Sequence, residues 1–69
     1  MTPLAKVQQI PGIRAKRFKD IIEVTAGDFL LRVEHYEGGG WHFQEHMSRP
    51  PLRDEHFTLR RLIHEALNG

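Results

Sequence analysis

The feature that most constrains this fold is an apolar pattern of period two on both sides of a Gly-Asp pair. The segments 21–26 and 29–36, IIEVTA and FLLRVEHY, are rich in β-branched and aromatic residues and are separated only by Gly27 and Asp28. Such segments are typical of β-strands, and glycine at the first position of a two-residue turn favours a type II′ hairpin. The turn predicts one apolar face of six paired residues: Ala26–Phe29, Val24–Leu31 and Ile22–Val33.

A third strand is expected after the triple glycine, over residues 41–47, WHFQEHM. A three-residue loop at Gly38–Gly40 keeps the large aromatic residues of this strand on the apolar face, where burying each is worth roughly 1.5–3 kcal/mol. A four-residue loop would turn them to the opposite face. The three-residue loop predicts the pairs Glu37–Trp41 and His35–Phe43. It also points Glu45 inward. Glu45 must then lie near an edge of the sheet, find a partner or mark a bulge.

Helices are expected at both ends of the chain. Residues 2–10 have apolar side chains at helical spacing, with Thr2 as the N-cap and Pro3 at the first position. A C-terminal helix ending at Asn68 is predicted by five apolar residues at helical spacing: Leu59, Leu62, Ile63, Ala66 and Leu67. Its start is open between Asp54 and Thr58, since both residues are good N-caps.

These elements predict an α+β fold: a three-stranded antiparallel meander packed against a C-terminal helix, with a short N-terminal helix or arm. The 69 residues make one small domain. We divide it into a helical and basic arm at 1–19, the sheet at 20–47 and the helix at 54–68. The conformation of residues 13–19 stays open between a second short helix and the lead-in to a strand.

The composition limits the environment of the chain. There are no cysteines, so disulfides and thiolate metal sites are excluded, and a reducing compartment, the cytoplasm, is the expected location. The apolar runs are too short to cross a membrane. The net charge is only +1, which is no broad nucleic-acid footprint. Positive charge is instead concentrated in one short segment, where we expect any contact with nucleic acid or another polyanion: Arg14, Lys16, Arg17 and Lys19.

The stretch 7–21, VQQIPGIRAKRFKDI, resembles half of a helix-hairpin-helix motif. That family packs two short helices around a PGIG hairpin whose backbone amides bind DNA phosphates. Six positions match the pattern: Val7, Ile10, Pro11, Gly12, Ile13 and Ile21. Arg14 replaces the second glycine, and Phe18 stands where a small residue is usual. The resemblance implies a second helix after the hairpin and phosphate contacts from Lys16 and Arg17. The alternative is a Pro-Gly turn followed by a solvated basic segment.

The histidines and glycines of residues 34–46 do not predict a metal, cofactor or catalytic site. His42 and His46 have the spacing of a helical zinc pair, but on a strand these positions are about 13 Å apart, and zinc needs both nitrogens at ~2 Å. The triple glycine lacks the lysine of a phosphate loop and indicates a tight hairpin, or a tip that approaches a partner at Gly39. No nucleophile and base are recognisable, so we expect no enzyme.

The predicted sheet face opposite the apolar one carries mixed side chains. It comprises Ile21, Glu23, Thr25, Leu30, Arg32, Glu34, Tyr36, His42, Gln44 and His46. One interpretation is an ordinary solvated face. The other is a recognition surface, because Tyr and Arg are enriched at binding hot spots. We select Arg32, Tyr36 and His42, with Gly39 in the loop, as partner-binding residues. The carboxylates of this face disfavour phosphate and therefore favour a protein partner.

The sequence thus favours a small non-catalytic binding protein. It would dock on a protein or nucleoprotein complex and regulate or inhibit it, as accessory proteins of phages and mobile elements do. The first alternative is direct nucleic-acid binding through residues 14–19, which predicts affinity that falls steeply with salt. A further alternative is a homodimer formed through the exposed edges of the small sheet.

Overall fold

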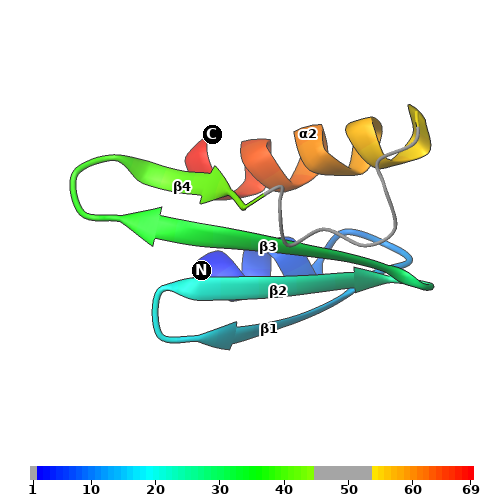
Figure 1. Ribbon diagram of the computed structural model, residues 1–69, viewed down its shortest axis with the longest axis horizontal. Helices are drawn as coiled ribbons and strands as arrows, with labels where there is room; N and C mark the ends of the chain where they lie inside the picture. Colours follow the sequence, from blue (N-terminus) through cyan, green and yellow to red (C-terminus); the bar gives the residue numbers. More distant parts are fainter. Residues whose placement is uncertain (1, 45–53) are drawn as a thin grey trace.

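The structure is a computed structural model that describes residues 2–44 and 54–69. Two helices flank four consecutive strands (Figure 1): α1 Pro3–Gln8, β1 Arg14–Phe18, β2 Ile21–Ala26, β3 Phe29–Tyr36, β4 Gly40–Phe43 and α2 Asp54–Asn68. The predictions for Glu45 and His46, and for the end of the predicted third strand, lie outside the described residues. Because α2 begins at Asp54, Thr58 lies inside the helix and is not its N-cap.

The α+β class, the antiparallel sheet and the C-terminal helix are confirmed, but the prediction of three strands is wrong. The described residues form a four-stranded meander in the order β1-β2-β3-β4. The additional strand is β1, which pairs with β2 from Arg14–Thr25 to Phe18–Ile21. Its weak sequence signal has a physical cause. An edge strand gains from charged residues, which discourage pairing with other chains, and these charges mask the apolar alternation.

The helix-hairpin-helix resemblance does not hold in the fold. The segment after Pro11–Gly12 is extended rather than helical, and its backbone pairs with β2. Gly12 adopts a φ of +83°, which suits a turn that ends α1. A two-residue turn at Lys19–Asp20, in which Lys19 has a φ of +54°, then joins β1 to β2. This hairpin replaces the second helix that the resemblance implied.

The register of the β2–β3 hairpin is confirmed, whereas that of β3–β4 is shifted. Val24 faces Leu31 and Ala26 faces Phe29, as the Gly27–Asp28 turn predicts. On the other side, Tyr36 faces Gly40 and His35 faces Trp41, so the three-residue loop is 37–39 and not 38–40. A shift of two residues along β4 leaves Trp41 on the apolar face. The amide of Gly39 closes the turn by donating to the Tyr36 carbonyl at 2.9 Å.

Both helices cover one face of the sheet, and the core lies between them and the strands (Figure 1). Thr2 caps α1 as predicted, since its hydroxyl accepts a hydrogen bond from the Ala5 amide at 3.2 Å. Buried side chains come from both helices and from three strands: Val7, Ile22, Val24, Phe29, Leu31, Val33, Trp41 and Ile63. We call this the inner face of the sheet, and the opposite side the outer face.

The end of α2 is tied to strand β4 by one side chain. The Asn68 carboxamide accepts from the Trp41 amide at 3.0 Å and donates to the Trp41 carbonyl at 3.2 Å. Asn68 therefore occupies the position that a neighbouring strand would take at this edge. A Cβ added to Gly40, whose φ is +76°, would lie 2.7 Å from the Asn68 Oδ1 atom. Glycine is needed there for both the backbone angle and the approach of α2.

Candidate partner-binding face

The outer face of the sheet contains side chains in rows that run across the strands. The pairing registers define the first row as Phe18, Ile21, Glu34 and His42. The second is Lys16, Glu23 and Arg32, and the third is Arg14, Thr25 and Leu30. Neighbours in a row are close enough to interact directly, because opposed side chains are about 4.5–5.5 Å apart at Cβ. The rows therefore form one continuous surface that four strands share.

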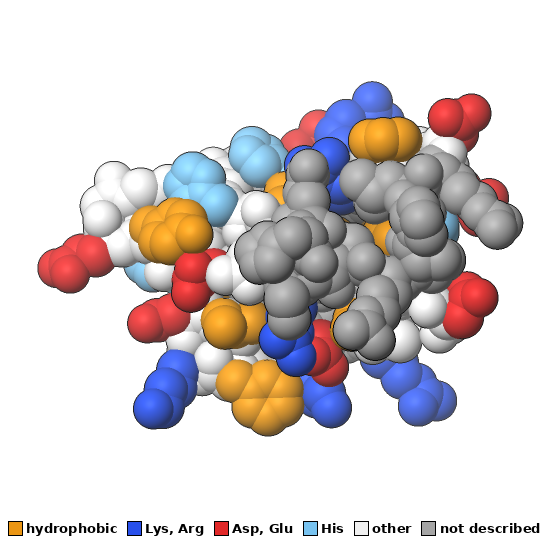
Figure 2. Space-filling view, viewed as in Figure 1, with side chains coloured by type: hydrophobic (Ala, Val, Ile, Leu, Met, Phe, Trp, Pro, Cys, Tyr) orange, Lys and Arg blue, Asp and Glu red, His pale blue; other side chains and the backbone are white. Residues whose placement is uncertain are grey.

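The first row carries exposed apolar surface. Phe18 is 56% exposed, and Tyr36, which stands beside this row on β3, is 48% exposed. Phe18 and Ile21 also line a hollow of about 590 Å³, together with Lys19, Asp20 and Glu34. Figure 2 shows this end of the sheet, where hydrophobic side chains stand beside acidic ones and histidine. Aromatic side chains of this exposure on a β-sheet face are typical of recognition surfaces.

Three of the residues selected from sequence come together near the 37–39 loop. The rings of Tyr36 and His42 are 5.0 Å apart, and the His42 Nε2 atom is 2.6 Å from the Gly39 carbonyl oxygen. A hydrogen bond to the Glu34 carboxylate, and the negative charge of that group, raise the pKa of Tyr36 above its ordinary value. Glu34 thus favours the protonated form of the Tyr36 phenol. Arg32 lies on the same face, in the second row.

The second row is a set of ion pairs centred on Glu23. Its Oε2 atom is 3.1 Å from both Nε and Nη2 of Arg32, and its Oε1 atom is 3.9 Å from Nζ of Lys16. Glu34 is also engaged, since its Oε1 atom accepts a hydrogen bond from the side-chain Nε2 atom of Gln44 at 2.9 Å. These pairings change the sequence-based argument about phosphate. Glu23 has a cation on either side, so it does not present an isolated negative charge to a ligand.

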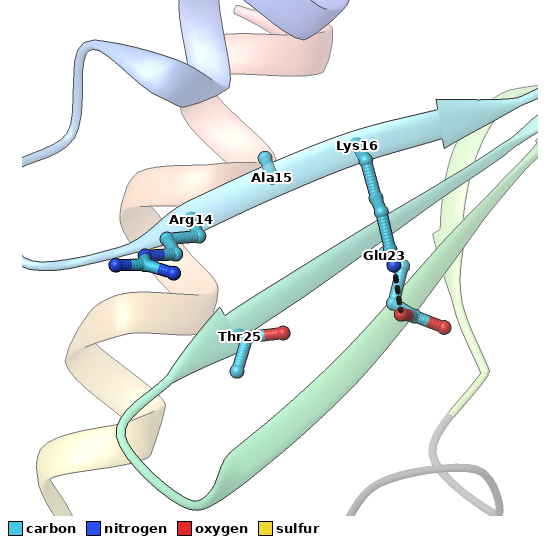
Figure 3. A pocket seen from close by; sticks show the side chains of 5 residues that line it. All are labelled: Arg14, Ala15, Lys16, Glu23 and Thr25. Carbon is cyan, nitrogen blue, oxygen red and sulfur yellow. Dashed lines mark ion pairs between the residues drawn. The ribbon is translucent and has the colours of Figure 1, made fainter.

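The third row borders a hollow of about 450 Å³ (Figure 3), lined by Arg14, Ala15, Lys16, Glu23 and Thr25. The close view shows Lys16 turned toward Glu23, whereas Arg14 points away from that pair and Ala15 lies on the opposite side of the strand. Arg14 and Thr25 also line the adjoining hollow toward Gly12 and Gly27. This corner therefore offers a guanidinium and a hydroxyl, with the ion-paired ammonium of Lys16 next to them.

The basic segment does not form a single patch. Arg14 and Lys16 lie on the outer face, whereas Arg17 lies on the inner side, where its guanidinium is 5.3 Å from the Trp41 ring centroid. Lys19 is in the turn, and its carbonyl accepts from the Arg17 Nε atom at 2.7 Å. The alternation of a β-strand thus divides cations that are neighbours in sequence. Only two of the four belong to the candidate site.

The structure adds Phe18 and Ile21 to the residues that the sequence singled out. Ile21 was assigned to the outer face, but Phe18 could be assigned only once β1 was known to be a strand. The signal that could have found it is the alternation of Arg14, Lys16 and Phe18 between two turns. Among the described residues, no group of three or more His, Asp or Glu side chains could hold a metal ion. The arrangement offers packing, ion pairs and hydrogen bonds, which are the means of recognition.

The chain was compared with known proteins. No family model, no curated protein and no solved structure matches it. Within the ranges that the structure describes, no helix has both the length and the apolar character needed to cross a membrane. The inference about function therefore depends on the outer face itself.

Proposed function

We propose that this chain is a cytoplasmic, non-catalytic binding protein that docks on a protein partner, alone or within a nucleoprotein complex, and regulates or inhibits it. The observation that carries the proposal is the exposed aromatic surface of the outer face. Phe18 and Tyr36 are about half exposed on a sheet face that neither α1 nor α2 covers. Removing such aromatic surface from water on a partner is the main source of binding energy at hot spots.

The charges of this face support a protein partner more than a polyanion. Arg14, Lys16 and Arg32 are balanced in part by Glu23 and Glu34, so the face is mixed rather than uniformly basic. Ion pairs that are already satisfied contribute little attraction at long range, but they define which charges a partner must present. A polar rim of this kind around exposed aromatic side chains is typical of protein–protein interfaces.

The test is capture of partners from the source cell's lysate on immobilised protein, with and without nuclease. A variant with Tyr36→Ala and His42→Ala removes the aromatic pair of the outer face. Leu62→Ala is the matched control, because Leu62 is 41% exposed but lies on α2. We expect a protein that survives nuclease, is lost with the double variant and is retained by the control. Retention by all three proteins would contradict the assignment of the outer face.

Direct nucleic-acid binding is the second candidate, favoured by one observation. Strand β1 adds Arg14, Lys16 and Phe18 to the face that already carries Arg32 and Tyr36. Exposed aromatic side chains beside cations on an antiparallel sheet can stack the bases of single strands. This candidate predicts that a labelled single-stranded oligonucleotide binds with affinity that falls steeply with salt, and that Phe18→Ala weakens it. It also predicts that the captured proteins vanish with nuclease.

A further inference from the structure

We propose that the edge of β1, which pairs with no further strand among the described residues, binds an acidic, extended segment of the protein partner, which adds to the sheet as a fifth strand. This inference rests on the proposed function, because it names the kind of segment that the protein partner presents. Strand addition is a recurrent mode of recognition in which backbone hydrogen bonds give affinity and alternate side chains give specificity. Two features of β1 carry the inference: the direction of its backbone groups and its charge.

The two edges of the sheet differ in how their backbone groups are satisfied. At β4, the Asn68 side chain contacts both the amide and the carbonyl of Trp41. At β1, the Ala15 carbonyl accepts from the Gln8 side chain at 3.2 Å, which shows that Ala15 directs its backbone away from β2. Because this direction alternates along an antiparallel strand, the exposed Arg17, two residues on, faces the same open side. Gln8 already contacts the Ala15 carbonyl, so the edge offers the Ala15 amide together with the amide and the carbonyl of Arg17.

This combination of donors and an acceptor selects a peptide. The amide of Arg17 needs an acceptor and its carbonyl needs a donor, and a neighbouring strand supplies both at the correct spacing. A phosphate oxygen only accepts hydrogen bonds, so it cannot satisfy the carbonyl. The backbone of β1 therefore favours an extended polypeptide over a phosphate group.

The charge of β1 selects an acidic peptide. The strand contains three cations and no carboxylate in its five residues, RAKRF. A second copy of β1 would bring cation beside cation, which disfavours a homodimer through this edge. On an added strand, carboxylates two residues apart would instead lie beside Arg14 and Lys16. Lys16 remains available, since its side chain is 66% exposed and 3.9 Å from Glu23.

The probe is a short synthetic peptide in which glutamate alternates with valine, and its lysine counterpart is the charge control. Each is titrated into the full chain, with backbone amide shifts read by NMR. We expect the glutamate peptide to shift the amides of β1, at Ala15 and Arg17 above all, and the lysine peptide to leave them unchanged. Amide exchange at Arg17 is expected to slow when the glutamate peptide is bound.

A pair of variants separates the backbone contact from the side chain. Arg17→Ala and Arg17→Pro both lose the guanidinium and its contacts with Lys19 and Trp41. Only the Arg17→Pro variant also loses the backbone N–H of residue 17. An edge strand tolerates proline where the amide faces outward, so pairing with β2 is kept. We expect the glutamate peptide to bind the Arg17→Pro variant with an affinity about tenfold or more lower than that for Arg17→Ala.

Several outcomes would overturn the inference. They are equal binding of the two peptides, equal affinity of the alanine and proline variants, or unchanged exchange at Arg17. The last readout uses the unmodified protein, so it decides the matter even if the proline variant does not fold. Stronger shifts of the β1 amides by a single-stranded oligonucleotide, insensitive to Arg17→Pro, would assign the edge to nucleic acid. A captured partner that is lost with Tyr36→Ala and His42→Ala but kept by Arg17→Pro would refute the edge site alone and leave the proposed function standing.

Discussion

The two faces of this sheet are built from the same strands but by different interactions. On the inner face, β2, β3 and β4 contribute apolar side chains that are almost fully buried against α1 and α2. On the outer face, the same strands carry ion pairs, hydrogen bonds and half-exposed aromatic rings. Ile22 and Glu23 are consecutive residues, yet one is a core residue and the other is the centre of an ion-pair row.

The difference indicates where stability and recognition reside. Buried apolar surface is the main favourable contribution to folding, whereas exposed ion pairs contribute little. A chain of this length has a small core, so most of its stability depends on few residues. The outer face can therefore be altered with little effect on folding, which is the property required of a surface that serves recognition.

The largest expected effect is on the inner face. Ile22→Ala removes a side chain with no exposed surface from the centre of the core, and we expect a loss of about 2–5 kcal/mol in the free energy of unfolding. Thr25→Ala, on the outer face of the same strand, is the control and should change it by no more than about 0.5 kcal/mol. Chemical denaturation measures both. Similar losses for the two variants would show that the faces do not differ as argued.

The next largest expected effect on the free energy of unfolding concerns the contact between Asn68 of α2 and Trp41 of β4. Gly38 and Gly40 share a φ of +76°, but only at Gly40 would a Cβ meet Asn68. We expect Gly38→Ala to cost about 1–2 kcal/mol from backbone strain, and Gly40→Ala about 1–3 kcal/mol more because Asn68 loses its contacts with Trp41. Thermal or chemical unfolding measures the difference.

A double-mutant cycle isolates that contact. In an Asn68→Ala background, Gly40→Ala should cost no more than Gly38→Ala, because the side chain that it displaces is already absent. If the excess cost of Gly40→Ala persisted in that background, the tie between α2 and β4 would not be its cause.

A smaller effect is expected on the outer face. Glu23→Gln removes the charge that pairs with Arg32 and Lys16, and we expect the free energy of unfolding to fall by about 1 kcal/mol or less, with the loss shrinking as salt is added. Glu37→Gln, an exposed carboxylate in the loop, is the control for the change of net charge. A loss as large as that of Ile22→Ala would mean that the outer face also holds the fold together.

The accuracy of the sequence-based predictions follows the same division. The β2–β3 register could be predicted because the Gly27–Asp28 turn and the apolar alternation select the same pairing. The predicted β3–β4 register was wrong by two residues, because burial of Trp41 fixes only the parity of the pairing. Shifts of two residues keep every side chain on its face, so the pattern cannot distinguish them.

The candidate site shows the same limit. Arg32, Tyr36 and His42 could be assigned to one face from alternation alone, and the structure brings them to it. The contribution of β1 could not be predicted, because an edge strand with a single inward apolar residue, Ala15, has almost no period-two signal. The partners of Glu23 were missed for the same reason, since one of them, Lys16, comes from that strand.

The smallest and most local effect is on the titration of Tyr36. In the folded chain, the hydrogen bond to Glu34 and its negative charge favour the protonated phenol, which raises the pKa above 10.0. The unfolded chain lacks this arrangement. The contribution of this contact to the stability of the fold is therefore fully present below the ordinary pKa of tyrosine. It is lost as the pH rises through the pKa that Tyr36 has in the folded chain. Glu34→Gln should bring the pKa back toward 10.0, because it removes the charge and weakens the acceptor.

Tyr36 is the only tyrosine, so the ultraviolet absorbance of its phenolate reports this group directly. Glu37→Gln makes the same change of charge one residue beyond Tyr36 and should leave the midpoint nearly unchanged, since long-range effects between exposed groups are screened. If both variants lowered the pKa equally, the shift would reflect net charge rather than the contact with Glu34. A lowering confined to Glu34→Gln would show that Glu34 and Tyr36 are held together before any partner binds, so that less ordering entropy is lost on docking.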